Sequence, residues 1–267
     1  MSYQIVVCAG IVPDPLQTLE PISTSAGPAL KNEMMLPHVL DPWAACSLYE
    51  AAHLAKQFPD SKVWLVSLAP KAKLQQVIMI VAQKATFELV VLDGPSSGFT
   101  DSAAVAAALA EAIASLPGLD RAKLLVFGGW ESASRSSGTT LQMLGERLGI
   151  LDQFQGVDQL KVQENGALEI LERVEGGRHQ ISVCEGPPAI LGWATGNLPE
   201  PPNNPQVGMA NMRTIMPALQ RAKAAQLALG NPAYQSAAVP KQQRDTRIVK
   251  DLPAEEIARE LAAWIRG

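Results

Sequence analysis

The chain has 267 residues, of which 47% are hydrophobic and 18% are charged. This composition excludes a disordered chain and fits one large folded domain or two modest ones. The formal net charge is −4, and no basic block is interleaved with aromatic residues, which argues against a general nucleic-acid-binding protein.

Strands and helices alternate over residues 1–150. Four apolar runs predict buried strands, at 4–9, 62–68, 88–92 and 123–127. Helices are predicted between them, at 41–58, 74–85 and 102–116. Asp41 and Asp101 are the expected N-caps of the first and third helices, whereas residues 12–28 are expected to form a long loop. This order predicts a parallel sheet that is covered by helices on both faces.

After residue 150 the pattern changes to short strands. Three strands are predicted at 156–163, 167–174 and 178–184, and the hairpin-turn signals ENG and EGG lie between them. An apolar strand is expected at 189–195, and the proline-rich segment 197–208 is expected to be an exposed loop. The fold class is therefore α/β, with an added antiparallel hairpin region.

The last fifth of the chain is polar until a final amphipathic helix. Ile257, Leu261 and Ile265 recur at four-residue spacing within residues 253–267, which predicts one apolar helix face. We therefore expect a nucleotide-binding domain over residues 1–216 and a C-terminal arm with its helix over residues 217–267.

Cysteine usage and the absence of targeting signals bear on the compartment. Cys8, Cys46 and Cys184 lie far apart in apolar surroundings, as expected for core residues in a reducing compartment. The N-terminus lacks the basic start of a signal peptide, and no apolar run reaches the roughly 18–20 residues of a membrane span. We expect a cytoplasmic protein without a membrane span.

The segment GGWESASRSSGTTLQML (128–144) carries the strongest functional signal. It follows a strand and leads into a helix, whose unpaired N–H groups and dipole suit a phosphate. Hydroxyl side chains surround Gly138, namely Ser134, Ser136, Ser137, Thr139 and Thr140. An ordinary capped helix with turn-forming serines explains the same pattern, and the segment is neither a Walker P-loop nor a GxGxxG fingerprint.

The position of this segment in the sheet favours a ligand site. Ligands bind at the carboxyl ends of the strands in such sheets, so the loops after Cys8, Ser67 and Phe127 are expected to meet there. We therefore predict that a nucleotide binds at this edge of the sheet.

Residues for bond-making chemistry are not grouped in this chain. His38, His53 and His179 have no metal-ligand spacing, and each is expected to be solvated or hydrogen-bonded. Ser136 and Ser137 lack the GxSxG nucleophile elbow. We expect no catalytic residue and no metal ligand, and hence a binding or carrier role.

The order of these segments resembles the β-subunit of electron transfer flavoproteins, almost from end to end. IVVCAGIVPDP resembles the family's first strand and loop, and DPWAACSLYEAAHLAK resembles the start of its next helix. VWLVSLAP, DSAAVAAALAEAI and the segment from Gly128 follow in the family's order. LEILERVEGGRHQISVCEGPPAIL resembles its hairpin and next strand, and ANMRTIMPALQRAK resembles the stretch after its partner-recognition loop.

This resemblance implies both a fold and a role. The fold is a nucleotide-binding domain of the adenine nucleotide α-hydrolase-like kind, with a C-terminal arm that embraces the α-subunit. The role is that of an electron carrier, not an enzyme, which accepts electrons from flavoprotein dehydrogenases and passes them to a quinone reductase or another acceptor. The redox FAD would lie mainly on the α-subunit, and this chain would bind AMP, or a second FAD in an electron-bifurcating member.

The resemblance also implies site residues. Nucleotide binding would involve Cys8 (its backbone), Asp41, Pro42, Trp43, Ala44, Leu68, Gly129, Ser134, Ser136, Ser137, Gly138, Thr139 and Thr140. Partner docking would lie near Met209 and Met212, where a flexible methionine suits a partner's pocket.

Several departures from the family pattern affect the phosphate site. Gly10 replaces a lysine, Ser134 and Ser136 replace two acids, and Thr139 and Leu141 replace a glutamine and a glycine. Loss of the lysine removes a positive charge, whereas loss of the acids removes repulsion and adds hydroxyl donors. The choice between AMP and FAD stays open.

Two other functions are compatible with the sequence. An adenine-nucleotide sensor or hydrolase of the universal-stress-protein type would share the α/β core, but it leaves the C-terminal arm unexplained. A scaffold subunit with a decayed nucleotide site would account for the lost lysine and acids.

Overall fold

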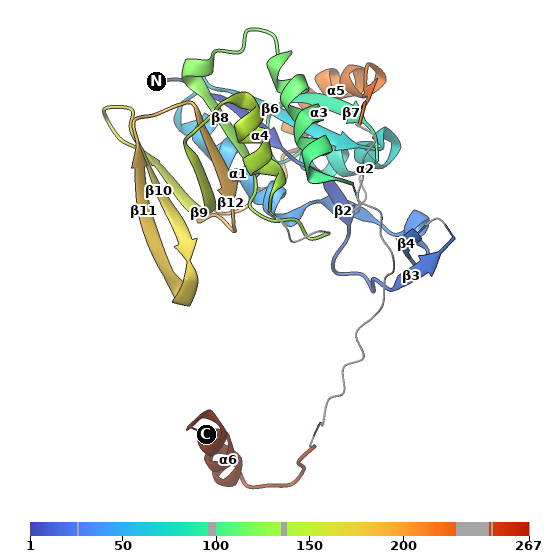
Figure 1. The fold of residues 1–267 in the computed structure, drawn as a ribbon, viewed down its shortest axis with the longest axis vertical. Coiled ribbons are helices and arrows are strands. Elements are labelled where there is room, and N and C mark those ends of the chain that lie inside the picture. The colour runs from blue at the N-terminus through green and yellow to red at the C-terminus, as the bar shows by residue number, and fades with distance from the viewer. Residues whose placement is uncertain (26, 96–99, 135–137, 228–245, 247, 267) are drawn as a thin grey trace.

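A nine-stranded sheet forms the centre of the protein in the computed structural model (Figure 1). The structure describes residues 1–25, 27–95, 100–134, 138–227, 246 and 248–266. The strand order is β11-β10-β9-β12-β8-β1-β6-β7-β13. Pairing is parallel from β9 through β13 and antiparallel within β9, β10 and β11. The predicted α/β class, with its antiparallel hairpin region, is confirmed.

Five of the parallel strands are short apolar runs, as predicted, namely β1 (Gln4–Cys8), β6 (Lys62–Ala69), β7 (Glu88–Asp93), β8 (Leu124–Gly129) and β12 (Ala189–Trp193). The two-residue β13 (Lys223–Ala224) was not predicted. Consecutive residues such as Ile5, Val6 and Val7 are fully buried because helices cover both faces of the sheet.

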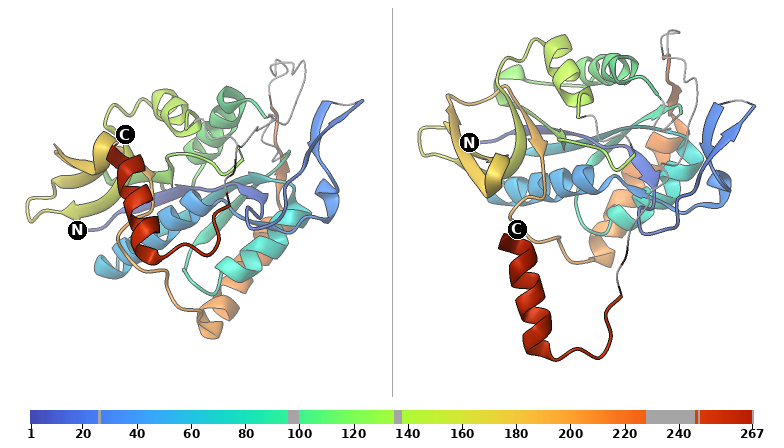
Figure 2. Two further views of the ribbon diagram at one scale, coloured as in Figure 1. Left: turned by 90° about the horizontal axis from the view of Figure 1, so that it is seen from below. Right: turned by 60° about the horizontal axis from the view of Figure 1, so that its bottom comes forward.

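The helices divide between the two faces (Figures 1 and 2). One core cluster joins α1 (Pro42–Gln57), α2 (Lys71–Val81) and α5 (Pro205–Gln220) to one face of the sheet. The other joins α3 (Ser102–Ala114) and α4 (Thr140–Leu148) to the opposite face. Asp41 and Asp101 cap α1 and α3 as expected, since their side chains accept backbone N–H groups of Trp43 and Ala104.

The chain reverses its direction of travel across the sheet at β1. From β1 it moves to β6 and β7 on one side, and it then returns through α3 to β8 on the other side of β1. The carboxyl ends of β1 and β8 therefore diverge into loops on opposite faces. Such a switch point is where open α/β sheets bind ligands.

The prediction of a loop over residues 12–28 is wrong. β2 (Ile11–Pro13) pairs with β5 (His38–Leu40), and β3 (Pro21–Thr24) pairs with β4 (Gly27–Leu30), followed by the 3-10 helix η1 (Glu33–Met35). Proline obscured these strands in the sequence. It is compatible with them because two-stranded ribbons consist only of edge strands, which tolerate a missing N–H group.

The prediction of a loop over 197–208 is wrong at its C-terminal end. Helix α5 begins at Pro205, and the side chain of Asn204 accepts the N–H groups of Gln206 and Val207. Proline at the first helical position and asparagine as the N-cap are both favourable, so the last of the prolines starts a helix. Residues up to Gln220 belong to α5, and β13 then pairs with β7. The domain boundary at residue 216 stays a prediction.

The antiparallel meander consists of β9 (Gln153–Val162), β10 (Leu168–Val174) and β11 (Arg178–Cys184), with a short 3-10 turn, η3 (Glu175–Gly177), before β11. β9 begins three residues earlier than predicted, because its first residues pair in parallel with β12. A further 3-10 turn, η2 (Arg121–Lys123), precedes β8.

The C-terminal helix α6 (Ala254–Arg266) contains no buried residue. The predicted apolar positions Ile257, Leu261 and Ile265 are exposed, together with Trp264. Figures 1 and 2 show α6 apart from the layers of the sheet. None of the helices within the described residues has the length and hydropathy that a membrane span requires.

Asn211 attaches α5 to the end of α2 and supports a first prediction. Its side-chain nitrogen donates to the carbonyl oxygens of Ala82 and Ala85, each at 2.7 Å, and the residue is 3% exposed. Asn211→Ala leaves buried acceptors unpaired and should lower the free energy of unfolding by about 1–3 kcal/mol. Urea denaturation tests this expectation, with Arg213→Ala on the exposed side of α5 as the control. Equal stability of both variants would contradict it.

Candidate functional site

A cavity of about 140 Å³ opens at the switch point of the sheet. Its walls come from the carboxyl ends of β1, β6 and β8, from the N-terminal turns of α1 and α4, and from α3. The lining residues that the sequence predicted are Cys8, Asp41, Ala44, Leu68, Gly129, Ser134, Gly138 and Thr140. The loops that follow three separate strands thus meet as expected from parallel-sheet topology.

The other predicted residues are placed differently. Pro42 is exposed, Trp43 is half-buried, and Thr139 precedes α4 without lining the cavity. Ser136 and Ser137 lie outside the described residues.

The cavity also has an apolar wall, which the sequence did not lead us to predict. It consists of Val66 on β6 and of residues that α3 and α4 direct inward, namely Val105, Leu109, Leu141 and Leu144. The apolar periodicity of the two helices was the available signal, but it was interpreted only as core. This wall suits the flat ring of a base.

Asp41 forms hydrogen bonds with two elements that line the cavity, the start of α1 and the loop after β8. Its Oδ1 accepts the N–H of Trp43 at 3.3 Å, and its Oδ2 accepts the Ser132 hydroxyl at 2.7 Å and the Ala133 N–H at 3.1 Å. Burial raises the pKa of the Asp41 carboxyl, and these hydrogen bonds oppose the increase. A single carboxylate therefore joins the start of α1 to the loop after β8.

Two glycines allow that loop to pass close to its neighbours. A Cβ at Gly129 would lie 2.7 Å from the Cβ of Trp43, so any larger residue would push α1 away. Gly138 has a φ of +58°, and a Cβ there would collide with the carbonyl oxygen of Trp130. The shape of the loop therefore depends on glycine at both positions.

The N-terminus of α4 supplies the donor side of the cavity. Among the described residues, the side chain of the N-cap Thr139 makes no hydrogen bond to the first turn of α4. The helix dipole favours a negative group there. Among the described lining residues the charged groups are the carboxyls of Asp41 and Glu131, so a phosphate would depend on backbone and hydroxyl donors.

Cys8, at the end of β1, lines the cavity. Burial raises the pKa of its thiol to about 12, so the side chain is neutral at physiological pH. Cys184 is also buried, whereas Cys46 is only half-buried, and all three cysteines are free. The expectation of core cysteines is thus met fully at two of the three positions.

Each histidine has a hydrogen-bond partner. His38 contacts the Leu36 carbonyl oxygen and the Lys73 ammonium, and His53 contacts the Pro199 carbonyl oxygen. His179 contacts the carboxylate of Asp158. These contacts agree with the expectation of hydrogen-bonded histidines.

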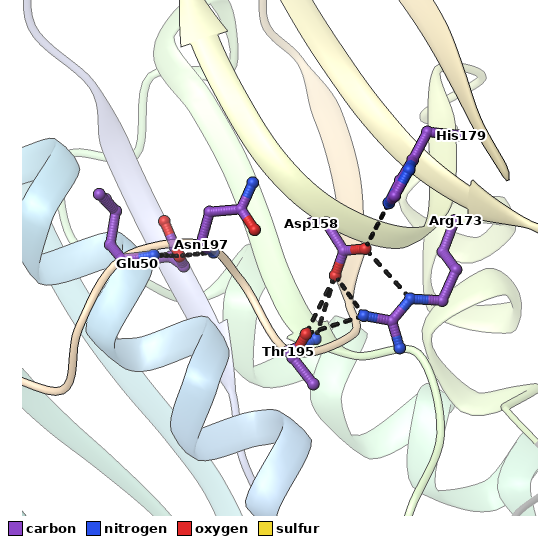
Figure 3. A network of polar contacts seen from close by, with 7 residues as sticks. Glu50, Asp158, Arg173, His179, Thr195 and Asn197 are labelled. Atoms are coloured by element: carbon purple, nitrogen blue, oxygen red, sulfur yellow. Dashed lines mark hydrogen bonds and ion pairs between the residues drawn. The ribbon is translucent and has the colours of Figure 1, made fainter. Parts of the chain in front are cut away.

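Two buried carboxylates fix the segment 195–200, which we call the strap, between β12 and α5 (Figure 3). Asp158 on β9 accepts hydrogen bonds from Arg173, from His179, and from the N–H and hydroxyl of Thr195. Burial alone would raise the pKa of Asp158, but these bonds and the charge of Arg173 lower it. Asp158 therefore remains ionised and attaches the start of the strap to the meander.

Glu50 on α1 holds the middle of the strap. Its Oε1 accepts the N–H groups of Asn197 and Leu198, each at 3.1 Å. Burial raises the pKa of Glu50, and the two N–H groups partly offset this. Gly196 has a φ of +68°, and a Cβ there would collide with the Glu50 carboxylate. The strap ends at Glu200, which contacts Tyr49 and Lys84, so its course toward α5 is fixed along its whole length.

Replacement of Asp158 tests the first attachment of the strap. Asp158→Asn removes the charge that Arg173 pairs with, and should lower the free energy of unfolding at neutral pH by about 1.5–3 kcal/mol. The folded-state pKa is lowered, so the contribution of Asp158 is present above the ordinary value of 3.8 and is lost as the pH falls below it. The difference between wild type and variant should therefore shrink in acid.

Urea denaturation at several pH values measures this difference, with Asp60→Asn in the exposed turn before β6 as the control. A difference that grows as the pH falls would contradict the role of an ionised Asp158.

Comparison with known proteins agrees with the site's position in the fold. Residues 33–226, which contain most of the cavity lining, the strap and α5, match the electron transfer flavoprotein domain. No curated protein matches the chain significantly. The match covers well over half of the chain, and the chain belongs to the electron transfer flavoprotein domain family.

Proposed function

We propose that this chain is the β-subunit of a heterodimeric electron transfer flavoprotein. The supporting observation is the cavity at the switch point, where the start of α4, which the Thr139 side chain does not cap, lies together with an apolar wall. This combination suits a nucleotide with its base on the apolar side and its phosphate at the helix N-terminus. The family membership supplies the role of an electron carrier.

The C-terminal segment supports the assignment to the β-subunit. It lies beyond the matched domain and ends in α6, whose apolar residues Leu261, Trp264 and Ile265 are exposed. An exposed apolar helix face gains stability when a partner covers it. We infer that the arm embraces an α-subunit, which carries most of the binding site of the redox FAD.

The residues of the cavity fit an adenine nucleotide. Leu109, Leu141 and Leu144 would contact the base, and the first N–H groups of α4 with the hydroxyl of Thr140 would hold a phosphate. The nucleotide is AMP in a carrier with one flavin, or a second FAD in an electron-bifurcating complex. The FAD of the complex supplies the redox chemistry, while this chain binds and positions.

The docking surface for a flavoprotein dehydrogenase is proposed to lie on α5. Met209 is 67% exposed, whereas Met212 is half-buried. Asn211 and the strap fix α5 against the domain, so Met209 projects from a rigid support. A quinone reductase or another acceptor would receive the electrons.

One observation favours a second candidate, a scaffold subunit with a decayed nucleotide site. The described cavity lining contains two carboxylates and neither lysine nor arginine. An isolated phosphate binds weakly where no cation offsets nearby carboxylates. This candidate predicts a complex that retains its partner but contains no nucleotide in this chain.

The cofactor content of the purified complex tests the proposal. The chain should be co-expressed with the neighbouring coding sequence, and the complex analysed by absorbance and by identification of nucleotides released on heating. We expect one FAD and one AMP per heterodimer, or two FAD in a bifurcating complex. A flavin without a second nucleotide would favour the scaffold, and neither flavin nor partner would overturn the electron-transfer role. Self-association with bound ATP would favour the sensor.

Met209→Ala tests the docking surface. Loss of an exposed anchor should raise the KM for the dehydrogenase about tenfold, because a few central apolar side chains supply most of an interface's binding energy. The absorbance spectrum of the bound flavin should stay unchanged. Met143→Ala, on α4 at the opposite face of the sheet, is the control. Equal KM values for the two variants would show that docking lies elsewhere.

A further inference from the structure

The hydrogen bonds of Ser132 and Ser134 have a fixed direction. The Ser132 hydroxyl donates to Asp41 Oδ2 at 2.7 Å, because an ionised carboxylate only accepts. The oxygens of Ser132 and Ser134 are 3.0 Å apart. Ser132 donates its single hydroxyl hydrogen to Asp41, so Ser134 is the donor in this contact, and Ser132 also accepts the Ser134 N–H at 3.3 Å.

Within the described residues, Ser134 therefore offers the cavity an acceptor. It lines the cavity, and its only hydroxyl hydrogen is directed to Ser132. The direction depends on Asp41, whose carboxylate also accepts the Trp43 and Ala133 N–H groups. Serine in this loop suggested a phosphate donor, whereas the hydrogen-bond chain gives Ser134 the opposite polarity.

The neighbouring charge has the same preference. Glu131 also lines the cavity, so the described lining near this loop contains a carboxylate as well as the Ser134 oxygen, and both accept hydrogen bonds. A phosphate, which offers acceptors and negative charge, does not suit this side. A ligand group with O–H or N–H donors does.

We propose that Ser134 accepts a hydrogen bond from a ribose hydroxyl, so that the site selects ribonucleotides over deoxyribonucleotides. This inference rests on the proposed nucleotide site. In adenosine 5′-phosphate the donors are the two ribose hydroxyls and the 6-amino group of the base. The apolar wall accommodates the base and the start of α4 the phosphate, so the sugar lies between them, beside the polar loop that contains Ser134.

Isothermal titration calorimetry tests the proposal. It measures nucleotide binding to the full chain after any bound nucleotide has been removed. AMP is the first probe, since AMP and FAD share adenosine 5′-phosphate. The other probes are 2′-deoxyAMP, 3′-deoxyAMP and inosine monophosphate, which lacks the 6-amino group. We expect at least one deoxynucleotide to bind about tenfold more weakly than AMP, because the missing ribose hydroxyl leaves a polar group of the site unpaired.

Ser134→Ala should abolish this selectivity. The variant should bind AMP and the deoxynucleotides with similar Kd values, near the wild-type Kd for the weaker deoxynucleotide. Ser115→Ala, at the exposed end of α3, is the matched control and should keep the wild-type ratio. Circular dichroism of each variant confirms that it is folded.

The remaining outcomes each overturn the proposal. Equal binding of AMP and both deoxynucleotides would exclude a role for the ribose hydroxyls, and selectivity that survives in Ser134→Ala would assign it to another residue. Rejection of inosine monophosphate alone would place the base amine at this side. Failure of folded wild-type protein to bind AMP at all would instead overturn the nucleotide site itself.

Discussion

The site depends on the three hydrogen bonds that the Asp41 carboxylate accepts. α1 and the loop after β8 are far apart in sequence, and Asp41 holds them together at the point where the sheet diverges. The same carboxylate sets the direction of the Ser132 and Ser134 hydroxyls. A buried charge is costly unless donors surround it, so its presence here constrains both the shape and the polarity of the cavity.

Glu50 on α1 and Asp158 on β9 show the same principle at the strap. Each is a buried carboxylate that accepts backbone N–H groups of the strap. Their pKa values move in opposite directions, because Asp158 has the guanidinium of Arg173 beside it and Glu50 has no such partner among its hydrogen bonds. Asp158 and Glu50 thus fix the strap that leads to α5, and burial raises the pKa of Glu50 there.

Local patterns predicted the fold well, because apolar runs and helix caps are encoded by adjacent residues. The strand after Tyr3 and the caps Asp41 and Asp101 are of this kind. The ribbons around Pro21 and the start of α5 at Pro205 were missed, since proline indicates a loop unless its position in the ladder or helix is known. In the site, sequence identified Ser134 but not the direction of its hydrogen bond, which depends on a carboxylate about ninety residues away.

The proposed nucleotide site and the proposed docking surface are separate in the fold. The cavity faces α3 and α4, whereas α5 packs on the opposite face of the sheet. A nucleotide there would contact elements from several parts of the chain and would stabilise the folded domain by mass action, without reaching Met209. A ligand in this cavity suits a structural role, while the exposed residues of α5 and α6 remain available to partners. The domain would then combine a rigid nucleotide-filled centre with two separate surfaces for association.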